Sequence, residues 1–191
     1  LLQEGSVDFD GRYYSSHSSI QTPVDVPVMA SALQPKSFEL CGAGADGAIT
    51  WVCPASYLRD VALPAMKAAA EKADRPTPPL IYGGPACVHD NPDEVKAAIR
   101  EELGHVRLAF YQRMLAAAGF PDAFNGTWSD AMIDAVTLSG NESQVKEQIE
   151  GLFSIGVTEI MACPVAAGSD QAASVERTLR LLAEVSISMK G

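Results

Sequence analysis

The stretch from Val26 to Pro54 constrains the fold of this chain more than any other part. It runs VPVMASALQPKSFELCGAGADGAITWVCP, and it reads as a buried strand, a short helix of small residues, a turn at Asp46-Gly47 and a second buried strand. Two apolar strands joined through a helix are typical of a parallel strand-helix-strand unit. The stretch therefore predicts an α/β fold in which strand ends and a small-residue loop can approach a ligand closely.

The rest of the chain repeats this alternation. We expect four buried strands, at residues 26–32, 47–53, 80–88 and 157–165. Alternation of strands and helices predicts a parallel sheet covered by helices. The expected helices span residues 35–43, 54–74 and 91–119, then a segment on Val145, Ile149, Leu152 and Phe153, and a last one on Val175, Leu179, Leu182 and Val185.

Three segments depart from the regular alternation. Residues 6–14 alternate polar and apolar side chains around Asp10-Gly11, which is typical of a short hairpin at the surface. The run Gly83-Gly84-Pro85 predicts a bulge in the third strand or a bend at a loop. Residues 120–138 read as a turn followed by a short helical excursion.

Composition narrows the class of protein and of partner. The chain has 191 residues, fewer than the roughly 250 that an eight-stranded barrel usually needs. Its 47% apolar residues allow a substantial core, and a formal charge of -10 argues against a nucleic-acid partner. No apolar run reaches the roughly 20 residues of a membrane span. We expect a soluble, cytoplasmic protein.

The four cysteines do not form a recognisable site. Cys41, Cys53, Cys87 and Cys163 stand far apart, without a Cys-x-x-Cys spacing or a nearby pair of histidines. We expect buried, reduced thiols and no metal site.

The candidate ligand site lies at the carboxyl ends of the first two long strands. In parallel sheets with helical crossovers, ligands bind where strand ends leave backbone N–H groups free and helix N-termini offer partial positive charge. Main-chain donors and the Ser31 hydroxyl can reach a phosphate there, and Thr50 supplies a second hydroxyl on the neighbouring strand. The alternative is that small residues are simply needed where helix meets sheet. The predicted binding residues are Ala30, Ser31, Ala32, Leu33, Gln34, Thr50, Trp51 and Val52.

Other polar residues are weaker candidates for chemistry. His89-Asp90 could be a base with its orienting carboxylate, but the pair directly precedes a helix start at Asn91-Pro92, which favours a capping role. His17 lies in a serine-rich loop and His105 within a predicted helix. No nucleophile with a base can be identified, so no catalytic residue is predicted.

Several blocks of the sequence resemble one enzyme superfamily. They are LLQEGSVDFDGRYY, the Val26–Trp51 block with Gly42 and Ala45-Asp46-Gly47, the alanine-rich helix ending in ADRP, and LSGNESQVKEQIEGLFSIGVTEIM. In this order they resemble the carboxyl half of the luciferase-like monooxygenase superfamily. The likeness covers nearly the whole chain and is greatest to the branch that depends on coenzyme F420.

The resemblance implies a (β/α)8 TIM barrel of which residues 1–191 are the carboxyl portion of a single domain. Val26, Gly47, Leu80 and Val157 would then open strands five to eight, and the amino half would be missing. In the family the ends of the fifth and sixth strands, matching 30–34 and 50–52, cradle the cofactor phosphate. Many relatives are glycine-rich where this chain has Leu33-Gln34, so side chains are expected to form part of the cradle.

The resemblance also implies a function. We expect an oxidoreductase that transfers a hydride between F420 and a small organic substrate, with this chain supplying the phosphate-binding half. The alternatives are a monooxygenase that uses reduced FMN and a non-catalytic flavin-binding protein; an unrelated, self-sufficient α/β domain also stays open. The chain alone is expected to be inactive and to pair with its missing amino half or with a second copy, as a homo-oligomer.

Overall fold

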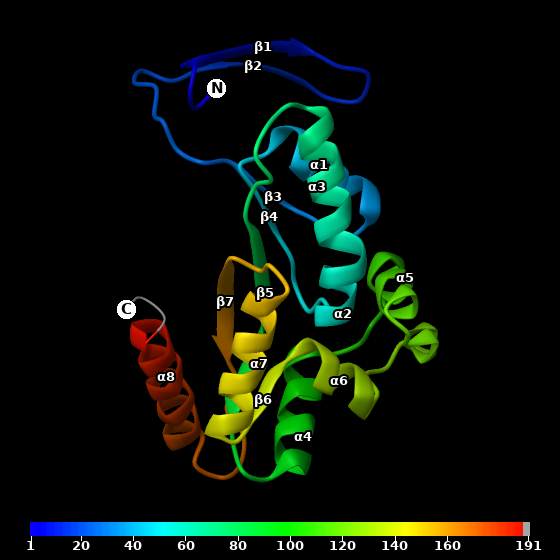
Figure 1. Cartoon of the computed structure of the whole chain (residues 1–191), viewed down its shortest axis with the longest axis vertical. Helices are drawn as coiled ribbons and strands as arrows, with labels where there is room; N and C mark the ends of the chain where they lie inside the picture. The colour runs from blue at the N-terminus through cyan, green and yellow to red at the C-terminus, as the bar shows by residue number, and fades with distance from the viewer. Residues whose placement is uncertain (189–191) are drawn as a thin grey trace.

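The computed structural model describes residues 1–188, and its centre is a parallel sheet (Figure 1). Four strands lie side by side in the order β3 (Met29–Ser31), β4 (Gly47–Ile49), β5 (Leu80–Val88) and β7 (Glu159–Pro164). Every neighbouring pair among them is parallel. The predicted α/β class and four parallel strands are confirmed, although β3, β4 and β7 are each shorter than the sequence suggests. The prediction that all four are buried is wrong for β3 and β7, which are partly exposed.

Helices follow each strand. After β3 comes α1 (Pro35–Gly44), and after β4 one continuous helical rod made of α2 (Ala55–Tyr57), the π-helical turn η1 (Leu58–Ala62) and α3 (Leu63–Lys72). The last strand is preceded by α7 (Glu142–Ser154) and followed by α8 (Gln171–Ser188). None of the helices in residues 1–188 is long and apolar enough to cross a membrane.

Two residues of the Val26–Pro54 block lock α1 against the sheet and against α3. A Cβ on Gly42 would stand 2.2 Å from the backbone oxygen of Met66, so the two helices approach as closely as only glycine allows. Asp46 bridges the two strands, since its carboxylate accepts from the N–H of Val28 at 2.7 Å and its own N–H donates to the Val28 carbonyl at 2.9 Å.

The two faces of the sheet differ in how well they are covered. Ala30, Ala48 and Leu80 are partners in adjacent strands and form one row, of which Ala48 and Leu80 are buried under helices. Ser31, Ile49, Ile81 and Glu159 form the next row, on the opposite face. Ser31 and Glu159 at its two ends are exposed, and Met161 farther along is 45% exposed. The second face, called the inner face below, is therefore only partly covered.

The strand β5 runs straight through Gly83-Gly84-Pro85, so the predicted bulge or bend is wrong. Ala86 pairs with Pro164 of β7 and also with Leu138 of a short additional strand, β6 (Leu138–Gly140), which places β6 on the edge that β4 occupies farther back. Along β5, Ile81 and Gly83 bond towards that shared edge. Pro85 continues this alternation, so its missing N–H falls in the gap between β4 and β6, where no ladder bond is required.

The helix predicted for residues 91–119 is two helices. α4 (Pro92–Leu103) ends at Gly104, whose φ of +63° cannot continue a right-handed helix, and α5 (Ala109–Ala117) starts afresh. A 3₁₀ turn, η2 (Pro121–Asn125), and α6 (Asp130–Val136) complete the excursion between β5 and β6. The predicted N-cap is confirmed, because the Asn91 side chain accepts from the N–H of Asp93.

The buried stripe of α8 matches the predicted one only in part, at Val185. Ser174, Thr178, Leu181 and Val185 are buried, whereas Leu179 is half exposed. The two hydroxyl residues face inward because they bond backbone groups there: Thr178 accepts from the N–H of Val88 in β5 at 2.9 Å, and Ser174 accepts from the N–H of Ala167, in the loop after β7, at 3.0 Å.

The predicted surface hairpin is confirmed, but its second strand lies at residues 15–19, beyond the predicted residues 6–14, so His17 belongs to a strand and not to a loop. β1 (Ser6–Asp10) and β2 (Ser15–Ser19) pair in antiparallel register and extend away from the parallel sheet (Figure 1). His17 lies across from Asp8 and has both ring nitrogens near carboxylates, at 2.5 Å from Asp8 and 3.3 Å from Asp10. This exposed histidine is thus engaged within the hairpin.

Candidate functional site

The loop after β3 carries unused hydrogen-bond donors. The N–H of Ala32 still belongs to the sheet, where it donates to the Ile49 carbonyl at 3.0 Å. The next two N–H groups, of Leu33 and Gln34, donate to no group among residues 1–188. Ser31 is exposed on the inner face beside them, and its hydroxyl forms no hydrogen bond with the described residues. Free donors thus gather at one end of the sheet.

The first turn of α1 has no capping side chain. Gln34 takes the N-cap position with extended backbone but accepts no bond, and no acidic residue lies in the first turn. By contrast, α4, α6 and α7 are capped by Asn91, Ser129 and Asn141. An uncapped N-terminus leaves the partial positive charge of α1 available to an anion.

Two long-range bonds hold this loop from outside. The hydroxyl of Tyr57, in α2, donates to the Leu33 carbonyl at 3.3 Å. The side-chain amide of Gln34 donates to the Phe110 carbonyl, in α5, at 2.8 Å. Leu33 and Gln34 are therefore the residues through which the loop is held in place, one by its backbone carbonyl and the other by its side chain.

The end of β4 lies beside this loop but is more occupied. Thr50 is buried, and its hydroxyl donates to the Ile81 carbonyl at 3.0 Å, so its proton is already engaged across the sheet. Trp51 is half-buried on the inner face, against Gly83. Ala30 is half-buried, and its carbonyl faces the Cys41 thiol, 3.9 Å from Sγ.

Val52 has an unusual backbone. Its φ is +46°, a left-handed conformation that β-branched residues rarely adopt. The conformation is held in place, because the N–H of Val52 donates to the Gly83 carbonyl at 2.9 Å and the side chain is buried. Strained residues of this kind persist where the surroundings fix them, and they cluster at ligand sites. The π-helical turn η1, six residues farther along, is a second irregularity of a type often found near functional sites.

The ends of β5 and β7 are closed by charged side chains instead. Arg177 of α8 binds the Asp90 carboxylate at 3.0 and 3.1 Å and the Glu142 carboxylate at 2.5 and 2.7 Å. The bonds from the guanidinium lower the pKa of Glu142 to about 2 and also lower the pKa of Asp90. These three residues, called the Arg177 clamp below, pair the guanidinium with two carboxylates of the chain itself.

His89 is likewise engaged. Its Nδ1 accepts from the N–H of Asn91 at 3.0 Å and its Nε2 lies 3.4 Å from a Glu94 oxygen. Both oxygens of Asp90 bond Arg177 instead, so the structure does not bring His89 and Asp90 together as a base and its orienting carboxylate. Gly168 packs over the histidine, because a Cβ there would lie 2.7 Å from Nε2.

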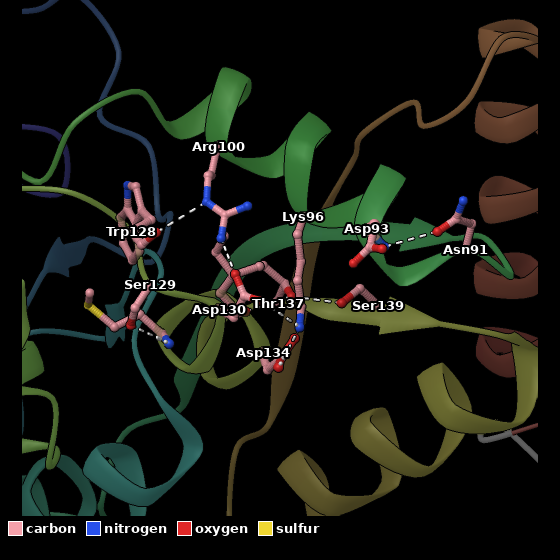
Figure 2. Close-up of polar contacts among 12 residues, drawn as sticks. Asn91, Asp93, Lys96, Arg100, Trp128, Ser129, Asp130, Asp134, Thr137 and Ser139 are labelled. Carbon is pink, nitrogen blue, oxygen red and sulfur yellow. Dashed lines mark hydrogen bonds and ion pairs between the residues drawn. The ribbon is translucent and has the colours of Figure 1, made fainter.

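A cavity of about 510 Å³ between α4, α6 and α7 is polar but internally neutralised. Figure 2 shows Lys96 pointing at Asp130 and Asp134, at 3.5 and 3.2 Å, while Arg100 contacts Asp130 and the Trp128 carbonyl. On the same excursion Thr137 and Ser139 share a hydrogen bond of 2.9 Å (Figure 2). These pairs fasten α4 to α6, and within residues 1–188 no group of three or more His, Cys, Asp or Glu side chains is arranged to hold a metal ion.

Comparison with known proteins identifies the family. The family model described as luciferase-like monooxygenase matches residues 1–159. The chain belongs to the luciferase-like monooxygenase family. It is also 27% identical over 179 residues to the 5,10-methylenetetrahydromethanopterin reductase of Methanolobus tindarius, which covers 83% of the chain. The same alignment covers 52% of the reductase, so the chain spans about half the length of that relative.

Solved structures of low identity share the fold. An F420-dependent secondary alcohol dehydrogenase superposes with a TM-score of 0.71 at 17% identity, over 96% of this chain and 57% of that one. The F420-dependent tetrahydromethanopterin reductase of Methanopyrus kandleri gives 0.65 at 21%, over 92% and 57%. The FMN complex of the oxygenating constituent of 3,6-diketocamphane monooxygenase from Pseudomonas putida gives 0.59 at 16%, over 93% and 56%. The luciferase-like TIM-barrel class is confirmed, and the described chain is a partial barrel.

Proposed function

We propose that this chain holds the phosphate of a flavin or deazaflavin in an oxidoreductase of the luciferase-like family. The leading assignment is coenzyme F420, with hydride transferred to or from a small organic substrate. The cofactor carries the redox chemistry, and the protein binds and orients it.

The observation that carries this proposal is the loop after β3. It combines two unengaged N–H groups, an exposed hydroxyl on Ser31 and the uncapped first turn of α1. A phosphate accepts hydrogen bonds and favours positive potential, so it satisfies all of these groups at once. The described residues therefore fit the anionic part of the cofactor.

Within the predicted set of binding residues, the structure supports unequal roles. Ser31 and the backbone of Leu33 and Gln34 are assigned to the phosphate, whereas Thr50 would have to surrender its bond to Ile81 before it could donate. Trp51 lies on the inner face and is assigned to a wall beside the cofactor ring. Ala30, Ala32 and Val52 shape the two strand ends through their backbones.

The choice of F420 over FMN follows from relatives. The reductase from Methanolobus tindarius has the highest identity among those compared, and the structure with the highest TM-score among those compared is an F420-dependent alcohol dehydrogenase. The monooxygenase bound to FMN superposes less well, with a TM-score of 0.59. It nevertheless keeps a monooxygenase that uses reduced FMN as the second candidate, and a non-catalytic flavin-binding protein as the third.

We further propose that the partly covered inner face receives the complementary barrel half, or a second copy of this chain. Ser31, Glu159 and Met161 lie exposed on it, and the chain spans about half of the relatives compared. A barrel closes only when both edges of the sheet find strands. The catalytic groups that face the cofactor ring are assigned to the complementary half.

The test is titration of the chain with F420 and with FMN, followed by the change in cofactor absorbance and fluorescence. Binding of F420 in preference to FMN supports the leading assignment, and the reverse preference supports the monooxygenase. Failure of both cofactors to bind at millimolar concentration would contradict the proposal. Binding without oxidation of either reduced cofactor, with the complementary half present, would favour the non-catalytic alternative.

A further inference from the structure

The hydroxyl of Tyr57 joins the two strand ends of the proposed cradle. Tyr57 lies in α2, just beyond the end of β4, and its buried ring packs against Phe38 of α1 with ring centroids 6.5 Å apart. From there the hydroxyl reaches back to the Leu33 carbonyl. Among the side-chain hydrogen bonds in residues 1–188, this one alone links residues 32–34 to residues 50–57.

The bond to Leu33 determines the direction of a neighbouring donor. The Leu33 carbonyl and the Gln34 N–H belong to one planar, trans peptide unit, so they point in opposite directions. Fixing the carbonyl therefore fixes where the N–H points. That N–H is one of the two unengaged donors of the loop, while the Gln34 side chain is anchored separately on Phe110.

We propose that Tyr57 is a positioning residue that holds the Leu33–Gln34 peptide so that its N–H faces the cofactor phosphate. This inference rests on the proposed phosphate cradle. Tyr57 does not touch the cofactor in this arrangement and acts through the peptide alone. A donor that is aimed before binding spares the ligand the cost of ordering the loop.

The environment of Tyr57 suits a permanent donor. Burial raises the pKa of its hydroxyl, so the group stays protonated at neutral pH and can only donate to a carbonyl oxygen. A buried hydroxyl without a partner is costly, so the bond to Leu33 also satisfies Tyr57 itself. A phenylalanine would fill the same space against Phe38 and would leave the peptide unit free to turn.

The experiment compares two ligands that differ in one group. FMN and riboflavin share the same ring and ribityl chain, but only FMN carries the phosphate, so the ratio of their dissociation constants reports the phosphate grip. We expect the chain to bind FMN more tightly than riboflavin. Tyr57→Phe should lower this preference for FMN over riboflavin by about 3- to 10-fold, as for the loss of one hydrogen bond. The affinity for riboflavin should not change.

Tyr82→Phe is the matched control. Tyr82 is also buried, and its hydroxyl also donates to a backbone carbonyl, that of Val136 at 2.7 Å. That bond ties β5 to α6, outside the loop after β3. Tyr82→Phe should therefore destabilise the fold to a similar extent and leave the preference for FMN at its original value.

A measurement without any variant makes the same distinction. With tyrosine labelled by ¹³C at Cζ, the resonance of Tyr57 should shift when FMN is added but not when riboflavin is added, while that of Tyr82 stays in place. A preference for FMN that survives Tyr57→Phe, or a Tyr57 resonance that ignores FMN, overturns the positioning role alone. Equal affinities for FMN and riboflavin, in an unchanged chain that binds both, overturn the proposed cradle, and the role of Tyr57 with it.

Discussion

The two pairs of strand ends in this sheet solve the same problem in opposite ways. At the ends of β5 and β7, the capping residue Asn91 and the Arg177 clamp satisfy the local charges and donors within the protein. At the ends of β3 and β4, α1 starts without a cap and two N–H groups stay unengaged. The difference teaches that one parallel sheet can satisfy its polar groups internally at one pair of strand ends and leave donors free at the other pair.

The largest effect should come from moving α1, whose uncapped first turn lies at the ends of β3 and β4. Gly42→Ala places a methyl group where the Met66 backbone oxygen lies 2.2 Å away, so α1 and α3 must separate. We expect a loss of about 3 kcal/mol in the free energy of unfolding, the upper part of the range for overpacked sites. Urea denaturation measures it.

Gly44→Ala is its control, because a Cβ there meets no atom within 4 Å. It lies in the same helix and should leave the stability unchanged or slightly raised. Equal losses in the two variants would show that the close approach of α1 to α3 is not what matters.

The second effect tests whether the anion binds at the ends of β3 and β4 or at the ends of β5 and β7. Ser31→Ala removes the exposed hydroxyl at the end of β3 and should weaken FMN binding about 10-fold, as for the loss of one hydrogen bond to a charged group. Ser169→Ala removes an exposed hydroxyl beyond β7 and should not change the affinity. Calorimetric titration of both variants decides between the ends, and a larger loss in Ser169→Ala would reverse the comparison.

The third effect concerns the Arg177 clamp at the ends of β5 and β7. Arg177→Met removes the guanidinium that holds Asp90 and Glu142, and it should cost about 1 kcal/mol, because the side chains are partly exposed and solvent screens the pairs. The affinity for FMN should stay the same. A loss of FMN binding with little change in stability would assign the clamp to the ligand site instead.

The same clamp predicts a dependence of stability on pH. Glu142 has a pKa of about 2 in the folded chain, below the ordinary value of a glutamate, and the pKa of Asp90 is lowered too. Depressed carboxylate pKa values stabilise the fold above the unfolded pKa and lose that contribution as the pH falls towards the folded one. Stability should therefore decline between about pH 4.5 and pH 2, and Arg177→Met should flatten that decline in thermal melts.

The smallest effect distinguishes the roles of the two hydroxyls predicted to bind phosphate, those of Ser31 and Thr50. Thr50→Val removes the bond to the Ile81 carbonyl, which also accepts the Thr50 N–H, so we expect a loss of only about 0.5–1 kcal/mol. The preference for FMN over riboflavin should not change. A reduced preference would restore Thr50 as a phosphate ligand, so that β4 as well as β3 would contribute a hydroxyl to the cradle.

The sequence predicted the alternation and most element positions because these follow from short-range patterns. The strand β5 was located to the residue, and the cap at Asn91 followed from the run Asn91-Pro92-Asp93-Glu94. The break at Gly104 was missed because the apolar stripe continues across it with helical spacing. A glycine within a long predicted helix was the signal that could have revealed it.

What the sequence could not predict are contacts between distant segments. Thr178 and Ser174 face inward because they accept from Val88 and Ala167, and nothing local distinguishes them from surface hydroxyls. The bonds of Tyr57 to Leu33 and of Gln34 to Phe110 span 24 and 76 residues. The candidate strand ends could therefore be named in advance, but the groups that hold them could not.

Pro85 has a consequence for how such a chain can diversify. Pro85 has no N–H to donate, and it lies between two separate pairing positions on the same edge of β5. One position is occupied by β4 and the other by β6. The segment between β5 and β6, from His89 to Thr137, adds no strand of its own to the sheet, and it meets the loop after β3 through the bond from Gln34 to the Phe110 carbonyl. We expect that it can be lengthened, trimmed or exchanged while β4 keeps its pairing with β5, provided that a carbonyl still meets the Gln34 side chain. The architecture then has a built-in point for grafting new specificity.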